Sequence, residues 1–173
     1  MQYTGGVSYV PKTKNSGRRE VYGLTSANAM FGQYDYAKRF PVPKKGAKGS
    51  GIRFETKVHS TLAARYPGYI SALPFRYSDV RGSRVCIPDG IFIHAGRVVV
   101  VEIKLRHCIE AWMQLRKLYF PVVTSAFGQS PRLLEVVQFY VPEVVFPEPT
   151  VVLPSFEQFL CSGAEMGVVL WGR

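Results

Sequence analysis

The eight residues VVVVEIKL, at positions 98–105, decide the fold and the candidate chemistry of this 173-residue chain. A run of β-branched residues is typical of a strand buried on both faces. Two charged residues interrupt the run, and because side chains alternate along a strand, Glu102 and Lys104 must share one face. Burying unpaired charges is unfavourable, so this pair forms either a salt bridge at the strand end or part of a metal site.

A second carboxylate precedes this strand in the segment RVCIPDGIFIHAG, residues 84–96. If the two segments form adjacent strands, Asp89 comes beside Glu102. Two close carboxylates are stable together when a hard divalent cation such as Mg²⁺ lies between them. The alternative is that Asp89-Gly90 only forms a hairpin turn, which this dipeptide favours. Apolar residues continue on both sides, however, and favour a bulged strand.

Hydrophobic periodicity around these residues predicts the order helix, three strands, helix, strand over residues 51–141. The first helix carries apolar residues at helical spacing and ends at Pro67-Gly68. Pro121 is expected to break the second helix, and the strand at 133–141 is expected to add in parallel through a right-handed crossover. The tail predicts a strand in VPEVVFPEPT, a short helix in SFEQFL and a terminal strand in GVVLW. The fold class is therefore α/β (α+β), with a central mixed sheet flanked by helices.

Pro88-Asp89 followed by Glu102-Ile103-Lys104 resembles the signature of the PD-(D/E)xK nuclease superfamily. The resemblance implies a restriction-endonuclease-like core in the order derived above, and it covers the core at 51–141 only. It also implies that Asp89, Glu102 and the main-chain carbonyl of Ile103 bind Mg²⁺, for which Mn²⁺ can substitute. Lys104 would then position or activate the attacking water and stabilise the charge that develops on the phosphate. Proximity to the metal in a partly dry site is expected to lower the pKa of Lys104.

Two helical residues are further candidates. Glu55 lies beside the buried stripe of the first helix, where many relatives carry an additional metal ligand; the alternative is a surface residue paired with Lys57 or His59. Gln114 resembles the Gln found after the motif in RecB-like members, which usually have a Tyr four residues later. Here Tyr119 lies five residues later, and ordinary polarity of a helix surface explains Gln114 equally well.

The net charge of +10 is concentrated near the start of the chain. Residues 1–50 contain nine Lys or Arg against two carboxylates, which gives this segment a charge of +7. Basic arms supply sequence-independent affinity for nucleic acids, since neutralised phosphates release counterions. We therefore expect residues 1–50 to form a basic arm and linker and residues 51–173 to form the nuclease domain. Aromatic residues in the arm could stack on bases or pin it to the core.

Several classes of protein are disfavoured. No apolar run approaches the ~20 residues of a membrane span, and the first residues do not look like a secretory signal, so a cytoplasmic protein is expected. The three cysteines include no C-x-x-C pair that would favour a disulfide framework or a zinc site. No Gly-rich phosphate-binding loop occurs, so any ATP-driven motor would be a separate protein partner. The compact size and basic arm are typical of phage or mobile-element proteins, which would place it in the host cytoplasm.

Together these features predict a Mg²⁺-dependent deoxyribonuclease, an endonuclease rather than an exonuclease. Its catalytic residues would be Asp89, Glu102, Lys104, Glu55 and Gln114. A homodimer is expected if the substrate is duplex DNA, because cutting both strands usually requires two sites. The alternative is a non-catalytic module on the same fold that binds nucleic acid or a protein.

Overall fold

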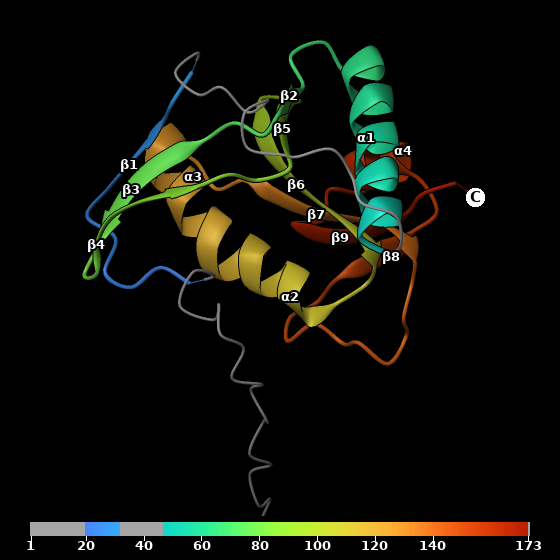
Figure 1. Ribbon diagram of the computed structural model, residues 1–173. Helices are drawn as coiled ribbons and strands as arrows, with labels where there is room; N and C mark the ends of the chain where they lie inside the picture. The colour runs from blue at the N-terminus through green and yellow to red at the C-terminus, as the bar shows by residue number, and fades with distance from the viewer. Residues whose placement is uncertain (1–19, 32–46, 173) are drawn as a thin grey trace, which may run out of the picture.

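The computed structural model describes residues 20–31 and 47–172, which form a mixed α/β fold with two sheets (Figure 1). The strands are β1 (Ser26–Ala29), β2 (Ile70–Ser71), β3 (Phe75–Asp79), β4 (Gly82–Cys86), β5 (Gly90–His94), β6 (Arg97–Arg106), β7 (Arg132–Phe139), β8 (Val151–Leu153) and β9 (Met166–Leu170). The helices are α1 (Ala47–Arg65), α2 (Ile109–Trp112), the π-helix η3 (Met113–Tyr119), α3 (Phe120–Phe127) and α4 (Phe156–Ser162).

The larger sheet is mixed and has the strand order β2-β5-β6-β7-β9-β8. Its central strand β6 pairs antiparallel with β5 and parallel with β7. The four valines that begin the VVVVEIKL run are all at most 1% exposed, as expected for a strand covered on both faces. The parallel pairing of β7 confirms the expected addition of that strand after a helix.

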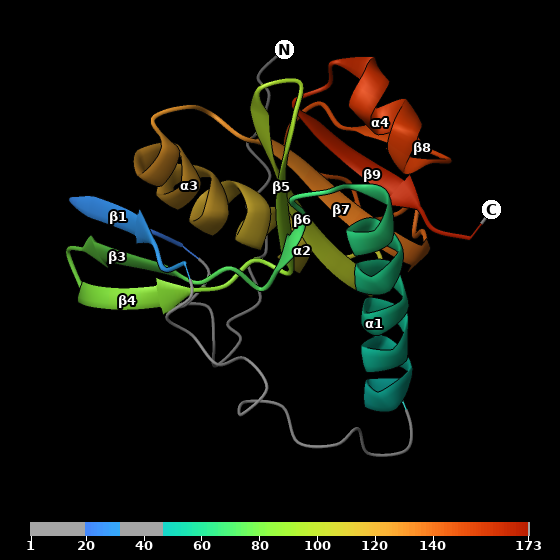
Figure 2. The same ribbon diagram turned by 90° about the horizontal axis from the view of Figure 1, so that it is seen from above.

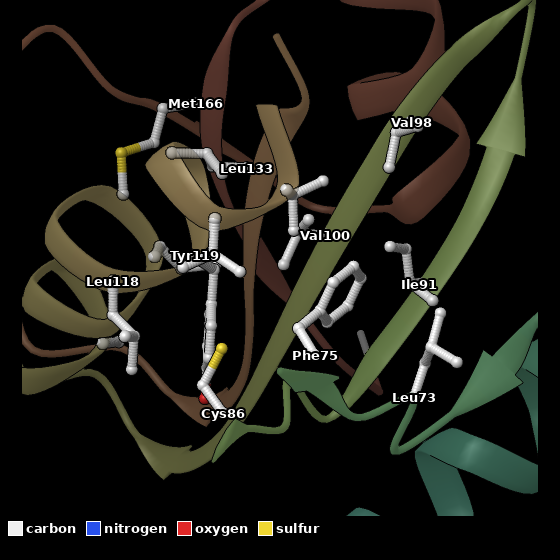
Figure 3. Close-up of a cluster of buried hydrophobic side chains, with 14 of the residues drawn as sticks. Leu73, Phe75, Cys86, Ile91, Val98, Val100, Leu118, Tyr119, Leu133 and Met166 are labelled. Atoms are coloured by element: carbon white, nitrogen blue, oxygen red, sulfur yellow. The ribbon is translucent and has the colours of Figure 1, made fainter. Parts of the chain in front are cut away.

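Helices cover both faces of the larger sheet (Figure 2). On one face α2, η3 and α3 pack together with the smaller antiparallel sheet, whose order is β1-β3-β4. The core on this side brings Phe75 and Cys86 against Val100 and Tyr119 (Figure 3). On the other face α1 and α4 bury a second apolar cluster against β6 and β7. The predicted mixed sheet flanked by helices is therefore confirmed.

The expected order of elements over 51–141 is not fully matched. Five strands, not three, lie between α1 and α2. The first expected strand is divided at Ala72–Pro74 into β2 and β3, and the second is divided at Ile87–Asp89 into β4 and β5. Each break contains a proline, which cannot donate to a sheet ladder. At each break the chain crosses between the two sheets, so Asp89-Gly90 is neither a bulge nor a hairpin turn.

The expectation that Pro121 breaks the second helix is wrong. The helical path runs without interruption from Ile109 to Phe127, and Gly128 ends it in the left-handed conformation with φ 69°. Pro121 falls in the first turn of α3, directly after the π-helical turn. In that turn Phe120 N–H bonds the carbonyl of Leu115, five residues back. We attribute the tolerance of this proline to the change of hydrogen-bond register there. Proline has no main-chain N–H, and in the first turn of a helix that group would have no partner within the helix.

The bounds of other helices and strands also differ from those expected. The first helix begins at Ala47, inside the expected linker, and β1 lies within the expected arm, where it pairs with β3. The expected strand in VPEVVFPEPT is absent; β8 begins at Val151, after the last proline of that segment. The expected short helix and terminal strand are α4 and β9. No helix in the described ranges is long and apolar enough to cross a membrane.

Candidate functional site

Asp89 lies beside Glu102 at the edge where β5 begins. The register pairs Gly90 with Val101, so one further step of the antiparallel ladder places Asp89 opposite Glu102, on the same face. The main-chain N–H of Ile103 donates a hydrogen bond of 2.7 Å to Asp89 Oδ2. Ala72, which has a left-handed backbone with φ 56°, donates its N–H to the carbonyl of Asp89 at 3.0 Å. The first bond ties the Asp89 side chain to β6, and the second ties its main chain to the segment that follows β2.

Glu102 and Lys104 form an ion pair on one face of β6, as the alternation of strand side chains predicts. The Glu102 side chain is only 1% exposed, whereas Lys104 is 26% exposed. Lys104 Nζ donates to Glu102 Oε1. The other oxygen, Oε2, is buried and has no partner in hydrogen-bonding geometry among the described residues, although the Tyr119 hydroxyl lies near enough to Glu102 to lower its pKa. A buried carboxylate oxygen without a donor is unfavourable by itself and is well suited to a cation ligand.

Asp89, Glu102 and Lys104 together have two acidic groups and one basic group, so the acidic groups are in excess. Burial raises the pKa of Asp89 well above its usual range, and the carboxylate of Glu102 adds to the effect. Burial also raises the pKa of Glu102, although Lys104 opposes that shift. For Lys104, burial favours a lower pKa, but Glu102 and Asp89 outweigh it and raise the pKa. The expectation of a lowered Lys104 pKa therefore does not hold for the protein groups alone: Lys104 is held protonated.

Ile103 presents its main chain to the same place. In a β-strand the N–H and C=O of one residue point toward the same neighbouring strand. Since the N–H of Ile103 donates to Asp89, its carbonyl also points toward the Asp89 side of β6. Two carboxylates and one main-chain oxygen therefore converge at the start of β5.

Glu55 on α1 lies close enough to act on this group electrostatically, because it raises the pKa of both Asp89 and Glu102. It also contacts His59, with 3.5 Å between Oε1 and Nε2. The Nδ1 atom of His59 lies 2.7 Å from the Tyr69 hydroxyl, which places the three side chains in a chain toward β5. Burial, then Asp89 and Glu55, raises the pKa of Tyr69. Glu55 therefore lies near the two carboxylates, as expected for a metal ligand, and it also contacts His59, as expected for a residue that pairs on the helix surface.

Gln114 meets Tyr119 because the helix between them is a π-helix. Five-residue spacing would place the two side chains on different faces of an α-helix, but a π-helix, with i to i+5 bonding, brings them together. Gln114 Nε2 lies 3.4 Å from the Tyr119 hydroxyl. That hydroxyl donates a 3.1 Å bond to the carbonyl of Ile87, two residues before Asp89. The π-helix therefore brings Gln114 and Tyr119 together despite their five-residue spacing.

Sequence reasoning missed a further carboxylate in the same row. Glu135 on β7 is the register partner of Glu102 and is fully buried. It binds Nδ1 of His107 and the main-chain N–H of Cys108, while Nε2 of His107 donates to the Val144 carbonyl at 3.0 Å. A charged residue inside the apolar run LLEVVQF is the same signal that singled out Glu102. Tyr69, also missed, has no such signal, since aromatic residues are common near strands.

The residues present fit a magnesium ion better than a metal that is enclosed by side chains. No group of three or more His, Cys, Asp and Glu side chains in residues 20–31 and 47–172 is arranged to hold a metal. Mg²⁺, however, is usually bound by one or two carboxylates, and water and substrate phosphate complete its octahedron. Asp89 and Glu102 with the oxygen of Ile103 match that pattern. Ionised Asp89, Glu102 and Glu55 together exceed the charge of Lys104 by two, the charge of one divalent cation.

The arm lies largely outside the described residues. Of its aromatic residues, Tyr22 and Phe31 are described and are half-exposed or more, whereas Tyr34, Tyr36 and Phe40 fall in the undescribed range. Its role in holding nucleic acid stays a prediction. Comparisons with protein-family models, with curated proteins and with solved structures find no significant match to this chain.

Proposed function

We propose that the protein is a Mg²⁺-dependent deoxyribonuclease of the PD-(D/E)xK type. The observation that carries the proposal is the convergence of Asp89 and Glu102 beside protonated Lys104, with one buried oxygen of Glu102 that has no hydrogen-bond partner among the residues the structure describes. Asp89, Glu102 and the Ile103 carbonyl would hold the ion, and Glu55 would bind it through a water or complete the negative field. Mn²⁺ offers similar oxygen coordination and should substitute.

The protein groups divide the chemistry between them. A bound Mg²⁺ would supply Lewis-acid polarisation of the phosphoryl oxygen and a more acidic water. Lys104, which the protein groups alone hold protonated beside Glu102, is suited to stabilise negative charge on the phosphate. Its partial exposure gives an incoming phosphate access to the ammonium group.

The helix that crosses this face would act as a support. Tyr119 holds the carbonyl of Ile87 and Gln114 contacts the same hydroxyl, so both would position the segment that ends at Asp89. Neither residue needs to touch the substrate for this role. Tyr119→Phe should therefore alter activity through the placement of Asp89 rather than through lost chemistry.

DNA is the proposed substrate because the chain is strongly basic, and an endonucleolytic cut is proposed over exonucleolytic shortening. The test is a panel of linear, circular, single-stranded and branched DNA, together with RNA, incubated with Mg²⁺, Mn²⁺ or EDTA. Cleavage that requires the metal and is lost in Glu102→Gln is expected. The matched control is Glu165→Gln, which removes an exposed carboxylate paired with Arg97 at the opposite end of β6. Salt-dependent binding of DNA without any cleavage would favour the non-catalytic alternative.

A further inference from the structure

A polar pocket of about 580 Å³ lies across α1 from the candidate site. Its wall includes Ser50, Arg53 and Lys57 of α1, Gln138 and Phe139 at the end of β7, and Trp171 just after β9. The buried stripe of α1 separates two polar flanks: Glu55 and His59 lie on the side of Tyr69, and Arg53 and Lys57 lie on the side of this pocket.

The two cations of the pocket are available for an external anion. Several other arginines in the described ranges are paired with carboxylates: Arg65 with Glu157, Arg97 with Glu165 and Arg116 with Glu148. By contrast, no carboxylate within the described part of the chain forms an ion pair with Arg53 or Lys57, and the pocket wall contains no acidic residue. Within residues 20–31 and 47–172, the one side-chain bond of Arg53 goes to Ser50 Oγ, at 3.1 Å. Both cations are exposed.

Aromatic rings accompany these cations. Phe139 is 52% exposed, an unusual position for a phenylalanine at the end of a central strand, and Trp171 is partly buried beside it in the same wall. Exposed aromatic faces next to cations form the combination by which proteins hold single-stranded nucleic acid: bases stack on the rings and phosphates bind the cations. Paired bases in a duplex do not offer their faces in this way.

The pocket is within reach of the candidate site. Along β6 the residues on the Glu102 face continue through Lys104 to the exposed Arg106, and Arg106 is the register partner of Phe139. Two residues of strand and one strand spacing separate the backbones of Lys104 and Phe139, which is about 8 Å. The side chain of Lys104 lies on the α2 face of the sheet and the pocket lies on the α1 face, so the connecting nucleotides must pass around the ends of β6 and β7. Stacked nucleotides advance about 3.4 Å each, so this path takes at least about three of them.

We propose that this pocket binds an unpaired DNA segment at least about three nucleotides from the scissile phosphate, with its phosphates on Arg53 and Lys57 and a base stacked on Phe139 and Trp171. The proposal rests on the proposed nuclease function and adds to it a substrate class: DNA that is single-stranded, at least locally, next to the cut.

The test measures binding without cleavage, in EDTA. In a Trp112→Phe background, Trp171 is the remaining tryptophan, so its fluorescence reports on the pocket. Titration with a thymidine oligonucleotide of about ten residues should quench this fluorescence through stacking. Phe139→Ala should weaken binding roughly five- to hundredfold. Arg53→Gln and Lys57→Gln should each weaken binding and reduce the slope of log affinity against log salt by about 0.7.

The matched control is Arg76→Gln, which removes one exposed cation from β3 in the smaller sheet. Melting temperatures of all variants must agree with that of the parent, so that loss of binding is not loss of folding. The proposal is overturned if Arg53→Gln and Lys57→Gln change binding no more than Arg76→Gln, or if a blunt duplex quenches Trp171 as strongly as the single strand. Strand binding by a protein that never cleaves would refute only the nuclease proposal.

Discussion

Replacing Asp89 by Asn should stabilise the protein when no divalent ion is present. Burial and the neighbouring carboxylates raise the pKa of Asp89 in the folded state, so the folded protein loses stability as pH rises and this group ionises. Asn cannot ionise, and its side-chain oxygen can still accept the 2.7 Å bond from Ile103 N–H. The variant therefore loses an unfavourable charge and keeps the contact.

The magnitude follows from linkage. For each pH unit by which the folded pKa exceeds the unfolded value of about 3.9, ionisation costs the folded state about 1.4 kcal/mol. In a chain of this length that corresponds to about 3–6 °C in melting temperature. The difference between Asp89→Asn and wild type should vanish near pH 4 and grow as pH rises toward the folded pKa. Thermal melts in EDTA between pH 4 and 8 measure it.

Adding Mg²⁺ should make the wild type more stable than Asp89→Asn. Wild type gains about 2.7 kcal/mol at a Mg²⁺ concentration of a hundred times Kd, whereas Asp89→Asn should gain far less. Asp79→Asn is the control with the opposite sign: although its burial opposes the effect, bonds from Arg81 lower the pKa of Asp79, so its neutral variant should be less stable at neutral pH. An Asp89→Asn variant that is less stable than wild type in EDTA, or equally stabilised by Mg²⁺, would refute the reasoning.

Three further predictions concern the site and its supports. Lys104→Met should slow cleavage by about 10²–10³-fold while Lys104→Arg retains more activity, because the role is electrostatic; single-turnover rates at equal protein folding measure both. Gly90→Ala should destabilise the protein by about 1–3 kcal/mol, since an added Cβ would lie 2.2 Å from the Tyr69 hydroxyl oxygen. Gly51→Ala, which meets nothing within 4 Å inside α1, should stabilise it by about 0.5–1 kcal/mol, and urea denaturation compares the two. Although burial opposes the shift, the bond to a buried carboxylate raises the pKa of His107, so stability should be full below about pH 6.5 and fall as pH rises through that raised pKa. Melts of His107→Gln should lack this decline, and an identical pH profile would contradict the assignment.

The local sequence was sufficient to predict those features of the structure that a single physical rule determines. Alternation along VVVVEIKL places Glu102 and Lys104 on one face, and a Pro-Asp step in the preceding segment comes beside them. The mixed sheet and its flanking helices follow from the same periodicities. Whether these residues act on a metal stays a prediction, because an ion leaves no signal in hydrophobic patterning.

Other features depend on tertiary contacts that cannot be predicted from the local sequence. Nothing in the hydrophobic pattern shows that β3 and β4 pair with β1 in a separate sheet rather than with β5. Pro121 is compatible with a continuous helix only because the preceding turn is π-helical, and that turn also joins Gln114 to Tyr119. Glu135 could have been found, since it interrupts an apolar strand as Glu102 does.

The most direct test of the central claim is the single-turnover cleavage rate of DNA by wild type and by Asp89→Asn, each measured in EDTA and after Mg²⁺ is restored. Wild type should cleave only with Mg²⁺, and Asp89→Asn, folded and at least as stable in EDTA, should be slower by at least about a hundredfold. Equal rates for the two proteins, or wild-type cleavage that persists in EDTA, would contradict a metal-dependent site built on Asp89 and Glu102.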